Sequence, residues 1–528
     1  MRALTVLYGG RLAPEAFEPV NAGEEEGKNA LVLALEKARR FPGTEKTVLL
    51  GLEGAVYPGL PPESGAFSVV REPGWTKKSL LERLSLLSAG FDLTFFAWAD
   101  CPLLDPGLAS ALAERHLRYA AEYSYADGWP YGFAPELLAP GTAGVLFKIL
   151  GDDNGPVERD CLFSVIQKDI NAFDIETEIS PVDLRLRRLS FTADSRRNFF
   201  LLRGFMAAGL KAASEAADYI EKRPELQRTL PAYFNIQVSA PCPQACSLCP
   251  WPRFGGDVPV TERRGFMDKG KFSELLDRIA AFTGDAVIGL SLWGELSLHP
   301  DKLDLIRAVL SRPSLALVIE TSGIGWKQED LELLAAEAAS APARKSPVLK
   351  GPLSWIVSLD AFDAGRYKEA RGPGFTEAVD CARRLIGLFP GSAYVQAVRV
   401  KGFEDDIEQF YRSWKEAVPA KGQSHIIIQK YDDFCGALPR LQASDLSPVK
   451  RQPCWHLLRD MVILLDGSVP FCREDLGSLQ AKGPFRGNVF TSSLEEIWKA
   501  GESLCLEQLR GNYPGICAVC DEYYTYNF

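Results

Sequence analysis

The sequence predicts an α/β protein of several domains, and three observations lead to this fold class. Short apolar runs alternate with helical stretches from Arg2 to about Met206. Six more strand-like runs, separated by helix-like segments, follow between residues 234 and 431. After about Leu441 the pattern breaks into Cys, Gly, Pro and aromatic residues, which is typical of a small domain held together by a metal centre.

The composition is that of a globular protein with several cores. The chain has 528 residues, of which 46% are hydrophobic and 24% are charged. Its net charge of -10 disfavours a broad surface for nucleic acid or for an anionic membrane, so we expect neither partner. The first apolar run, residues 3–8, is too short for a secretory signal, and no run is long enough to span a membrane. We therefore expect a cytoplasmic protein.

The first domain is expected over residues 1–212. Its helices are expected at residues 29–40 and 107–123, and its strands at residues 3–8, 47–52, 93–100, 144–150 and 173–179. The Ala-rich, charged stretch that follows, residues 213–232, is expected to be a helical linker that stops at Pro231.

The second domain is expected over residues 233–445, with the rhythm of repeated βα units. Its six strands are expected at residues 234–240, 286–295, 315–323, 355–360, 393–402 and 425–431. Six units favour a partial barrel, whose functional residues collect at the carboxyl ends of the strands. The cysteine-rich third domain is expected over residues 446–528.

A cysteine triplet directly follows the first strand of the second domain. Cys242, Cys246 and Cys249 have the spacing CxxxCxxC, and thiols in a reducing compartment point to metal or redox chemistry rather than to disulfides. A structural zinc site normally has four ligands, whereas three ligands leave one position open. An iron-sulfur cluster with one open iron fits better than the alternatives, which are zinc or free thiols.

The segment CPQACSLCP, followed by the βα rhythm, resembles the radical S-adenosylmethionine enzymes. The resemblance implies a partial (β/α)6 TIM-like barrel and a 4Fe-4S cluster on the triplet. It also implies S-adenosyl-L-methionine on the open iron and an external low-potential reductant as the electron source. The cofactor would then yield a 5'-deoxyadenosyl radical that abstracts hydrogen from a substrate, while the protein positions the reactants and excludes water.

Further residues match the cofactor-binding segments of this family. Gly294 and Glu295, at the end of the second strand, are similar to its Gly-Gly-Glu segment, with Trp293 at the first glycine position. Polar residues at or after the next two strand ends match its other cofactor contacts: Thr321, Ser322, Ser358, Asp360 and Arg371. The alternative for these residues is a role in turns or helix caps.

The C-terminal cysteines form a second set. Cys454, Cys472, Cys517 and Cys520, with Gly467 in the first interval, resemble the SPASM domain, whose cysteines bind auxiliary 4Fe-4S clusters. The resemblance implies one auxiliary cluster on these four ligands, with Cys505 as the substitute. A zinc ion bound by the four cysteines is the alternative.

Three residues after the sixth strand are candidates for catalysis. Asp432 and Asp433 could act as acid or base, and Cys435 could be a thiol that faces the substrate. The alternative for a buried cysteine is inert packing.

The first domain has its own resemblance. A buried strand ends at Asp100 in WADCPLLDP, which is similar to cytidylyltransferases and other GT-A-type nucleotidyltransferases. This implies a Rossmann-like domain in which Asp100 and Asp194 hold Mg²⁺ with a nucleotide. The family's phosphate loop is reduced here to Gly9-Gly10-Arg11, so we favour a retained fold that binds nucleotide, sugar or nothing over active nucleotidyl transfer.

The whole arrangement resembles the spiro-SPASM family. The leading hypothesis is a radical oxidoreductase that oxidatively modifies a peptide or protein side chain and passes an electron to the auxiliary cluster. One alternative is radical modification of a nucleotide-linked sugar or another small metabolite. The other is a non-catalytic iron-sulfur or zinc scaffold or electron carrier.

Overall fold

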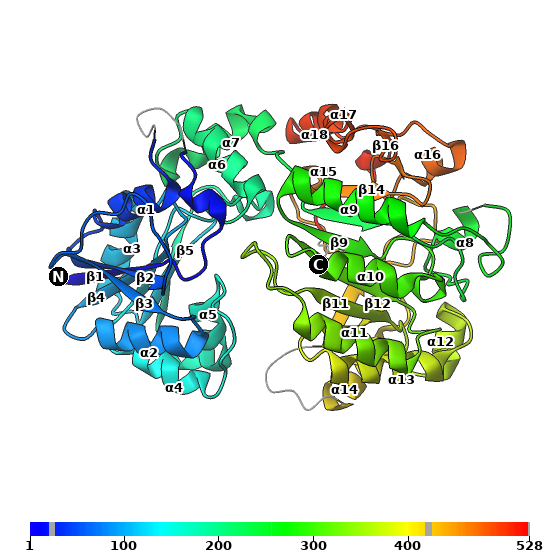
Figure 1. The fold of residues 1–528 in the computed structure, drawn as a ribbon, viewed down its shortest axis with the longest axis horizontal. Coiled ribbons are helices and arrows are strands. Elements are labelled where there is room, and N and C mark those ends of the chain that lie inside the picture. Colours follow the sequence, from blue (N-terminus) through cyan, green and yellow to red (C-terminus); the bar gives the residue numbers. More distant parts are fainter. Residues whose placement is uncertain (21–26, 255, 418–424, 526–528) are drawn as a thin grey trace. The chain divides into compact units, whose positions relative to one another are not determined.

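The structure, a computed structural model, describes residues 1–20, 27–254, 256–417 and 425–525. Two compact units divide the chain, Met1–Thr229 and Leu230–Phe528. The elements of both are labelled in Figure 1. Among the described residues, none of the helices combines the length and the apolar character that crossing a bilayer requires.

The first unit is built on one seven-stranded sheet with the order β3-β2-β1-β4-β6-β5-β7. All neighbours are parallel except β6, which is antiparallel to both β4 and β5. The central strand β1 is buried at all six of its residues. The strands are β1 (Ala3–Tyr8), β2 (Thr44–Leu52), β3 (Phe67–Glu72), β4 (Leu93–Trp98), β5 (Tyr123–Asp127), β6 (Glu136–Leu138) and β7 (Ile175–Ile179). The predicted α/β class is confirmed.

The helices of the first unit are α1 (Ala30–Ala38), α2 (Lys77–Leu87), α3 (Pro106–Arg118), α4 (Thr142–Leu150), α5 (Cys161–Ile166), α6 (Arg196–Ala207) and α7 (Ala216–Lys222). Short 3-10 turns are η1 (Pro14–Phe17), η3 (Gln167–Ala172), η4 (Arg185–Arg187), η5 (Ala213–Glu215) and η6 (Pro224–Leu226).

Two expectations for this unit differ from the structure. The strand predicted at residues 144–150 is wrong, because these residues belong to α4, which buries residues at helical spacing and packs on α2. The stretch predicted as a linker forms η5, α7 and η6. Ala213, Ala216 and Ile220 are buried in the core of the first unit, so this stretch is part of that unit.

The second unit has a parallel seven-stranded sheet with the order β13-β12-β11-β10-β9-β8-β14. The six predicted strands are all present and adjacent in sequence order. They are β8 (Tyr233–Ile236), β9 (Ala286–Leu290), β10 (Leu315–Thr321), β11 (Leu353–Ser358), β12 (Ala393–Arg399) and β13 (Ile426–Lys430). The seventh strand, β14 (Asp460–Ile463), comes from the cysteine-rich segment and pairs with β8. Residues before and after the predicted domain boundary at residue 445 therefore belong to one sheet, and this position is not a boundary between two separate sheets.

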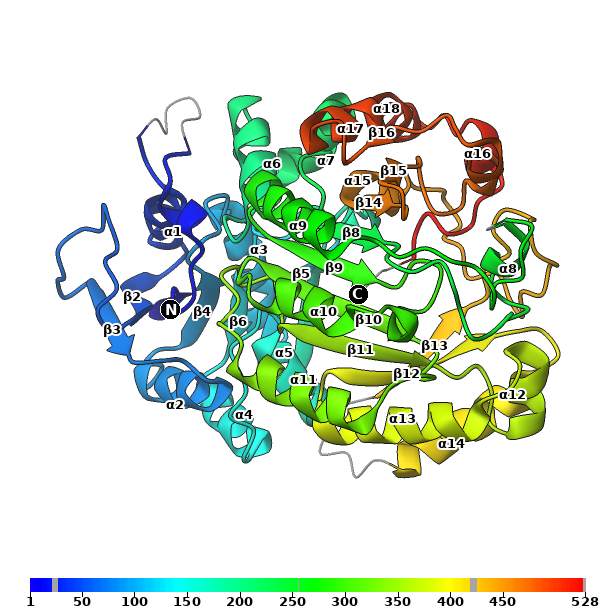
Figure 2. The same ribbon diagram turned by 45° about the vertical axis from the view of Figure 1, so that its right-hand side comes forward.

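Helices cover this sheet. Figure 2 shows α9 (Lys269–Thr283), α10 (Lys302–Leu310), α11 (Gln328–Ser340) and α13 (Phe375–Leu388) side by side along it. Asp268 caps α9 by accepting a hydrogen bond of 2.9 Å from the Lys271 backbone N–H, and the helix buries Phe272, Leu276 and Ile279 in the core. The others are α8 (Trp251–Phe254), η7 (Leu296–Leu298), α12 (Ala364–Ala370) and α14 (Glu404–Ala417).

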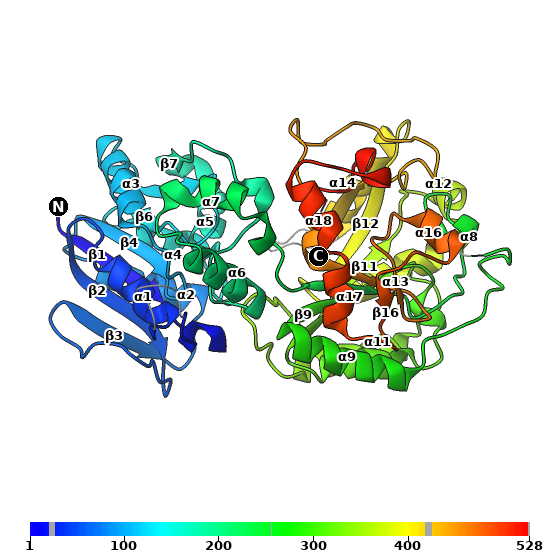
Figure 3. The same cartoon turned by 90° about the horizontal axis from the view of Figure 1, so that it is seen from above.

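The C-terminal part packs against the same sheet. It consists of α15 (Trp455–Arg459), β14, the hairpin of β15 (Ser468–Val469) with β16 (Gly487–Asn488), α16 (Leu476–Ala481), α17 (Leu494–Ala500), α18 (Glu502–Leu509) and η8 (Gly515–Ala518). Helix α17 packs on α9 (Figure 3), where the Arg278 guanidinium donates a 2.6 Å hydrogen bond to the Ser492 carbonyl. This packing attaches the C-terminal part to a helix of the second unit.

Candidate active site and cysteine centres

The triplet lies on a loop that leaves the carboxyl end of β8. Contacts to residues around α12 fix this loop: the Ser247 backbone N–H donates to the Ala370 carbonyl at 2.9 Å, and the Gln244 amide donates to the Tyr367 hydroxyl at 3.0 Å. Burial, together with the neighbouring Cys246, raises the pKa of Cys249 to about 12. The three thiols are therefore brought together as predicted, and a bound metal must displace their protons.

Gly294 occupies a position that no other residue fits. Its φ is +87°, and a Cβ atom there would lie 1.8 Å from the Ser239 carbonyl oxygen. This close approach directs the chain so that Glu295 follows in a buried position, 3% exposed. The glycine therefore sets where the Glu295 carboxylate lies.

The Glu295 carboxylate is held by two of the other predicted residues. The Thr321 hydroxyl donates to one oxygen at 2.7 Å, and the Ser322 backbone N–H donates to the other at 2.7 Å. Thr321 and Ser322 therefore orient Glu295, a role more indirect than the predicted cofactor contact.

Ser358, Asp360 and Arg371 line a cavity of about 180 Å³ that also borders Cys249 and Trp293. Asp360 has a φ of +58°, accepts a 3.0 Å hydrogen bond from the Val398 backbone N–H and pairs with the Arg371 guanidinium. These contacts place Asp360 and Arg371 at the cavity beside the triplet.

Sequence reasoning missed several polar residues of this cavity, among them Glu320 and Arg473. Glu320 accepts hydrogen bonds from Ser358 at 2.9 Å and from Gln396 at 3.0 Å, and burial raises its pKa. It ends β10 directly before Thr321, so the strand-end signal that identified Thr321 applied to it as well. Arg473 also lines this cavity, and its position next to Cys472 was the available signal.

Of the three catalytic candidates, the structure brings Asp432 to this cavity. Burial, together with the neighbouring Glu522, raises the pKa of Asp432 to about 6, although the Arg473 guanidinium opposes the shift. A carboxyl group with this pKa can accept a proton near neutral pH.

The placement of the other two candidates corrects the prediction, because Asp433 and Cys435 line a different cavity of about 220 Å³. Asp433 accepts hydrogen bonds from the Gly436 backbone N–H at 3.0 Å and from the Gln442 amide at 3.2 Å. Cys435 donates its thiol hydrogen to the sulfur of Cys520, which lowers the pKa of Cys520. Cys435 therefore contacts the C-terminal cysteines, whereas Asp433 stabilises the turn that contains Gly436.

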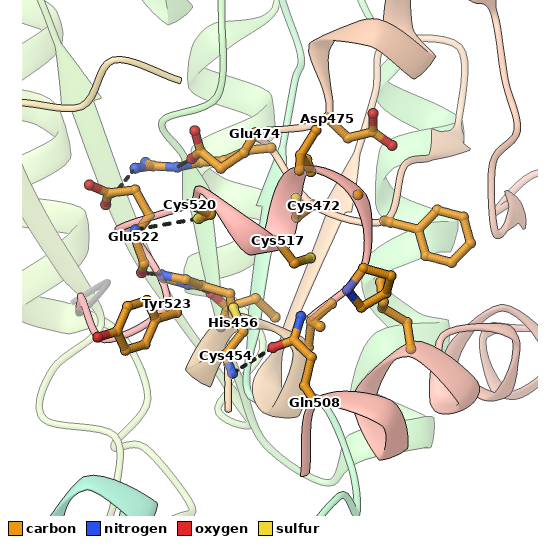
Figure 4. A pocket seen from close by; sticks show the side chains of 18 of the residues that line it. Cys454, His456, Cys472, Glu474, Asp475, Gln508, Cys517, Cys520, Glu522 and Tyr523 are labelled. Atoms are coloured by element: carbon orange, nitrogen blue, oxygen red, sulfur yellow. Dashed lines mark hydrogen bonds and ion pairs between the residues drawn. The ribbon is translucent and has the colours of Figure 1, made fainter. Parts of the chain in front are cut away.

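The four C-terminal cysteines line one cavity of about 570 Å³ (Figure 4): Cys454, Cys472, Cys517 and Cys520. The Cys454 backbone N–H donates to the Gln508 side chain at 2.9 Å, and the Arg451 guanidinium donates to the Cys520 carbonyl at 2.8 Å. Cys505 is 1% exposed, and it packs on Leu457 and Leu458 in an apolar cluster that Cys454 also contacts. Cys505 is not among the residues that line this cavity, so its role as a substitute ligand stays a prediction, and Cys435 is a further thiol in contact with Cys520.

Two side chains border both cavities. Arg473 lines the 180 Å³ cavity beside Cys249 and the 570 Å³ cavity beside Cys472. Its guanidinium pairs with Asp432 at 3.1 Å, with Glu474 at 2.7 Å and with Glu522 at 3.5 Å. Asn235 of β8 also lines both cavities, so the two sites share a wall.

In the first unit the structure brings Asp100 and Asp194 together, as predicted for metal ligands. The Arg159 guanidinium, however, lies between them, 2.7 Å from Asp100 and 2.6 Å from Asp194. The residues present therefore do not fit a divalent cation, and the predicted Mg²⁺ site is corrected to an ion-pair network.

Comparisons with known proteins agree with the C-terminal assignment. The family model for SPASM, an iron-sulfur cluster-binding domain, matches residues 454–521, which confirms the predicted SPASM domain. The chain is 39% identical over 374 residues to an uncharacterized protein of Treponema pallidum (strain Nichols), covering 70% of this chain and 98% of that protein. The chain therefore belongs to the same family as the treponemal protein.

Two solved structures show weaker likeness. Streptococcus suis SuiB bound to precursor peptide SuiA is 14% identical with a TM-score of 0.42, covering 72% of this chain and 85% of SuiB. A cytidylyltransferase from Leptospira borgpetersenii serovar Hardjo-bovis (strain JB197) is 17% identical with a TM-score of 0.34, covering 43% of this chain and 95% of the transferase. Scores this low leave the substrate open.

Proposed function

We propose that the protein is a radical S-adenosylmethionine enzyme that oxidatively modifies a peptide or protein side chain. When bound, the two clusters and S-adenosylmethionine supply a radical that takes a hydrogen atom from the substrate and an acceptor for the electron that the substrate then gives up. The observation that carries the proposal is the shared wall, because Arg473 borders both the cavity beside Cys249 and the cavity of the SPASM cysteines.

The chain's own residues have separate tasks at the cofactor end of the cavity. Cys242, Cys246 and Cys249 would hold the radical-forming cluster. The Glu295 carboxylate, which Thr321 and Ser322 orient, would accept hydrogen bonds from the amino group of the methionyl moiety. The remaining polar groups at the strand ends, Ser358, Asp360 and Arg371, would orient the rest of the cofactor.

Asp432 has the task of proton acceptor at the substrate end. Its carboxylate lines the cavity, and its pKa of about 6 leaves it mostly ionised at neutral pH. A substrate radical that loses a proton to an Asp432 oxygen becomes a stronger reductant. Cys454, Cys472, Cys517 and Cys520 would hold the second cluster directly behind Arg473.

Deuterium transfer tests this proposal and separates it from its alternatives. Perdeuterated cell extract, divided by size into a polypeptide fraction and a small-molecule fraction, is incubated with the reconstituted enzyme and S-adenosylmethionine. We expect deuterated 5'-deoxyadenosine with the polypeptide fraction. Deuterium from the small-molecule fraction would support a metabolite substrate instead, and its absence from both would contradict a hydrogen-abstracting enzyme.

A further inference from the structure

The first unit contains a cation of the chain itself, Arg159, that is paired with two buried carboxylates. The Arg159 guanidinium makes four hydrogen bonds to two carboxylates, with Asp100 at 2.7 and 3.2 Å and with Asp194 at 2.6 and 3.1 Å. The side chains of Asp100 and Asp194 are 1% and 3% exposed. Both carboxylates are therefore paired with the same guanidinium.

Distant parts of the unit bring these three residues together. Asp100 lies just after β4, Asp194 lies just before α6, and Arg159 precedes α5. The guanidinium carbon lies 4.8 Å from the ring centre of Trp98 and 5.1 Å from that of Tyr131. These two rings add cation–π contacts to the four hydrogen bonds, so the guanidinium is held firmly in one place.

The charge balance of this network excludes a second cation. A divalent ion between the two aspartates would have to displace the Arg159 guanidinium from both carboxylates and break its four hydrogen bonds. With the guanidinium in place, the network has a net charge of -1, so it repels the phosphates of a nucleotide rather than attracting them.

The backbone that would contact phosphates is covered as well. A Cβ atom on Gly10 would lie 2.4 Å from the Trp75 indole, so this indole packs directly on the short loop after β1. The Trp75 indole N–H donates to the Gly51 carbonyl at 2.7 Å, and the Tyr57 hydroxyl donates to the Gly9 carbonyl at 3.2 Å. Side chains of the unit thus cover the backbone of the short loop that stands where the resemblance implies a phosphate loop.

We propose that Arg159 permanently takes the place of the divalent cation, so that the first unit is a metal-independent structural module and not a nucleotidyltransferase. This inference is independent of the radical chemistry in the second unit. A first unit of this kind would not bind a nucleotide-linked sugar and present it as the substrate.

Manganese binding tests the inference, with the cluster-loaded full-length chain and electron paramagnetic resonance of Mn²⁺ as the readout. We expect wild type and Asp194→Asn to bind the same amount of Mn²⁺. Arg159→Ala should gain a single additional site, because the two freed carboxylates then form one. The double variant with Arg159→Ala and Asp194→Asn should lose this additional site again.

Two results would overturn the inference. One is a wild-type Mn²⁺ site that disappears in Asp194→Asn, because Arg159 would then yield to the metal. The other is a folded Arg159→Ala variant that gains no site. If Arg159→Ala does not fold, the comparison of wild type with Asp194→Asn and with Asp100→Asn still decides, since neither variant changes the guanidinium.

Discussion

The guanidinium of Arg473 lies 3.1 Å from the carboxylate of Asp432, and this ion pair joins the cavity beside the cysteine triplet to the cavity of the SPASM cysteines. The pair places the Asp432 carboxylate on one side of a shared wall and the SPASM cysteines on the other. In the proposed function, a substrate in the first cavity would lose a proton to Asp432 and an electron to a cluster on the other side of Arg473.

Replacing Asp432 tests its role as proton acceptor. We expect Asp432→Asn to lower the rate of product formation by about 100-fold, the usual range for loss of a general base. Release of 5'-deoxyadenosine should continue, because Asp432 is not assigned to the cofactor. The matched control is Asp433→Asn, whose carboxylate lines a different cavity and should leave the rate within a few-fold of wild type.

The pH dependence follows from the same carboxylate. The pKa of Asp432 is raised to about 6, so the group is ionised above that pH and protonated below it. The rate of product formation should therefore fall as the pH falls through about 6. Arg473 opposes protonation and Glu522 favours it. If the residual rate of Asp432→Asn falls in the same way as the pH falls through about 6, the group that titrates is not Asp432.

Arg473 also stabilises the fold. Arg473→Met would leave the carboxylates of Asp432, Glu474 and Glu522 without this partner, and we expect a loss of about 3 kcal/mol of unfolding free energy. Arg440→Met is the control, because Arg440 is 81% exposed and lies 3.8 Å from its carboxylate partner. Urea unfolding measures the free energy of unfolding of both variants. Equal losses would show that the ion pairs of Arg473 stabilise the fold no more than the exposed pair of Arg440.

Much of the second unit could be predicted, for clear physical reasons. Its strands are apolar runs bounded by turn residues, and the triplet follows one of them at the expected place. The strand predicted at residues 144–150 is wrong because a short apolar run is compatible both with a buried strand and with the buried side of a helix. Leu146 and Leu150, four residues apart, are both buried, which identifies a helix, but this burial is seen only where α4 packs on α2.

The predictions of site residues were wrong where contacts between residues far apart in the sequence determine the structure of the site. Arg159 is 59 residues from Asp100 and 35 from Asp194, so no local pattern connects them. Asp432 and Asp433 are neighbours in sequence but line different cavities, because the turn that follows places Phe434 and Cys435 at positive φ of 51° and 56°.

Gly294 provides a test of the cofactor end of the cavity. Gly294→Ala places a Cβ atom 1.8 Å from the Ser239 carbonyl oxygen, so the chain must move and carry Glu295 with it. We expect S-adenosylmethionine affinity to fall by about tenfold or more, equivalent to about 1.4 kcal/mol. Gly351→Ala is the control, since a Cβ atom there has no neighbour within 4 Å. Unchanged affinity in calorimetry would exclude Glu295 from cofactor binding.

The auxiliary ligand set can be tested by iron content. Cys472→Ala should remove one cluster and leave about four irons per chain, with 5'-deoxyadenosine release retained. Cys505→Ala should keep all the iron, because Cys505 is not among the residues that line the cavity of the four cysteines. A loss of iron in Cys505→Ala equal to that in Cys472→Ala would show that the ligand set is different.

The most direct test of the central claim compares wild type with a variant in which Cys242, Cys246 and Cys249 are all alanine. Both are purified without oxygen, reconstituted with iron and sulfide, and assayed for iron and for 5'-deoxyadenosine under strong reductant. The account predicts about eight irons and release in wild type, and about four irons without release in the variant. Zinc in both cysteine sets and no 5'-deoxyadenosine from wild type would contradict it.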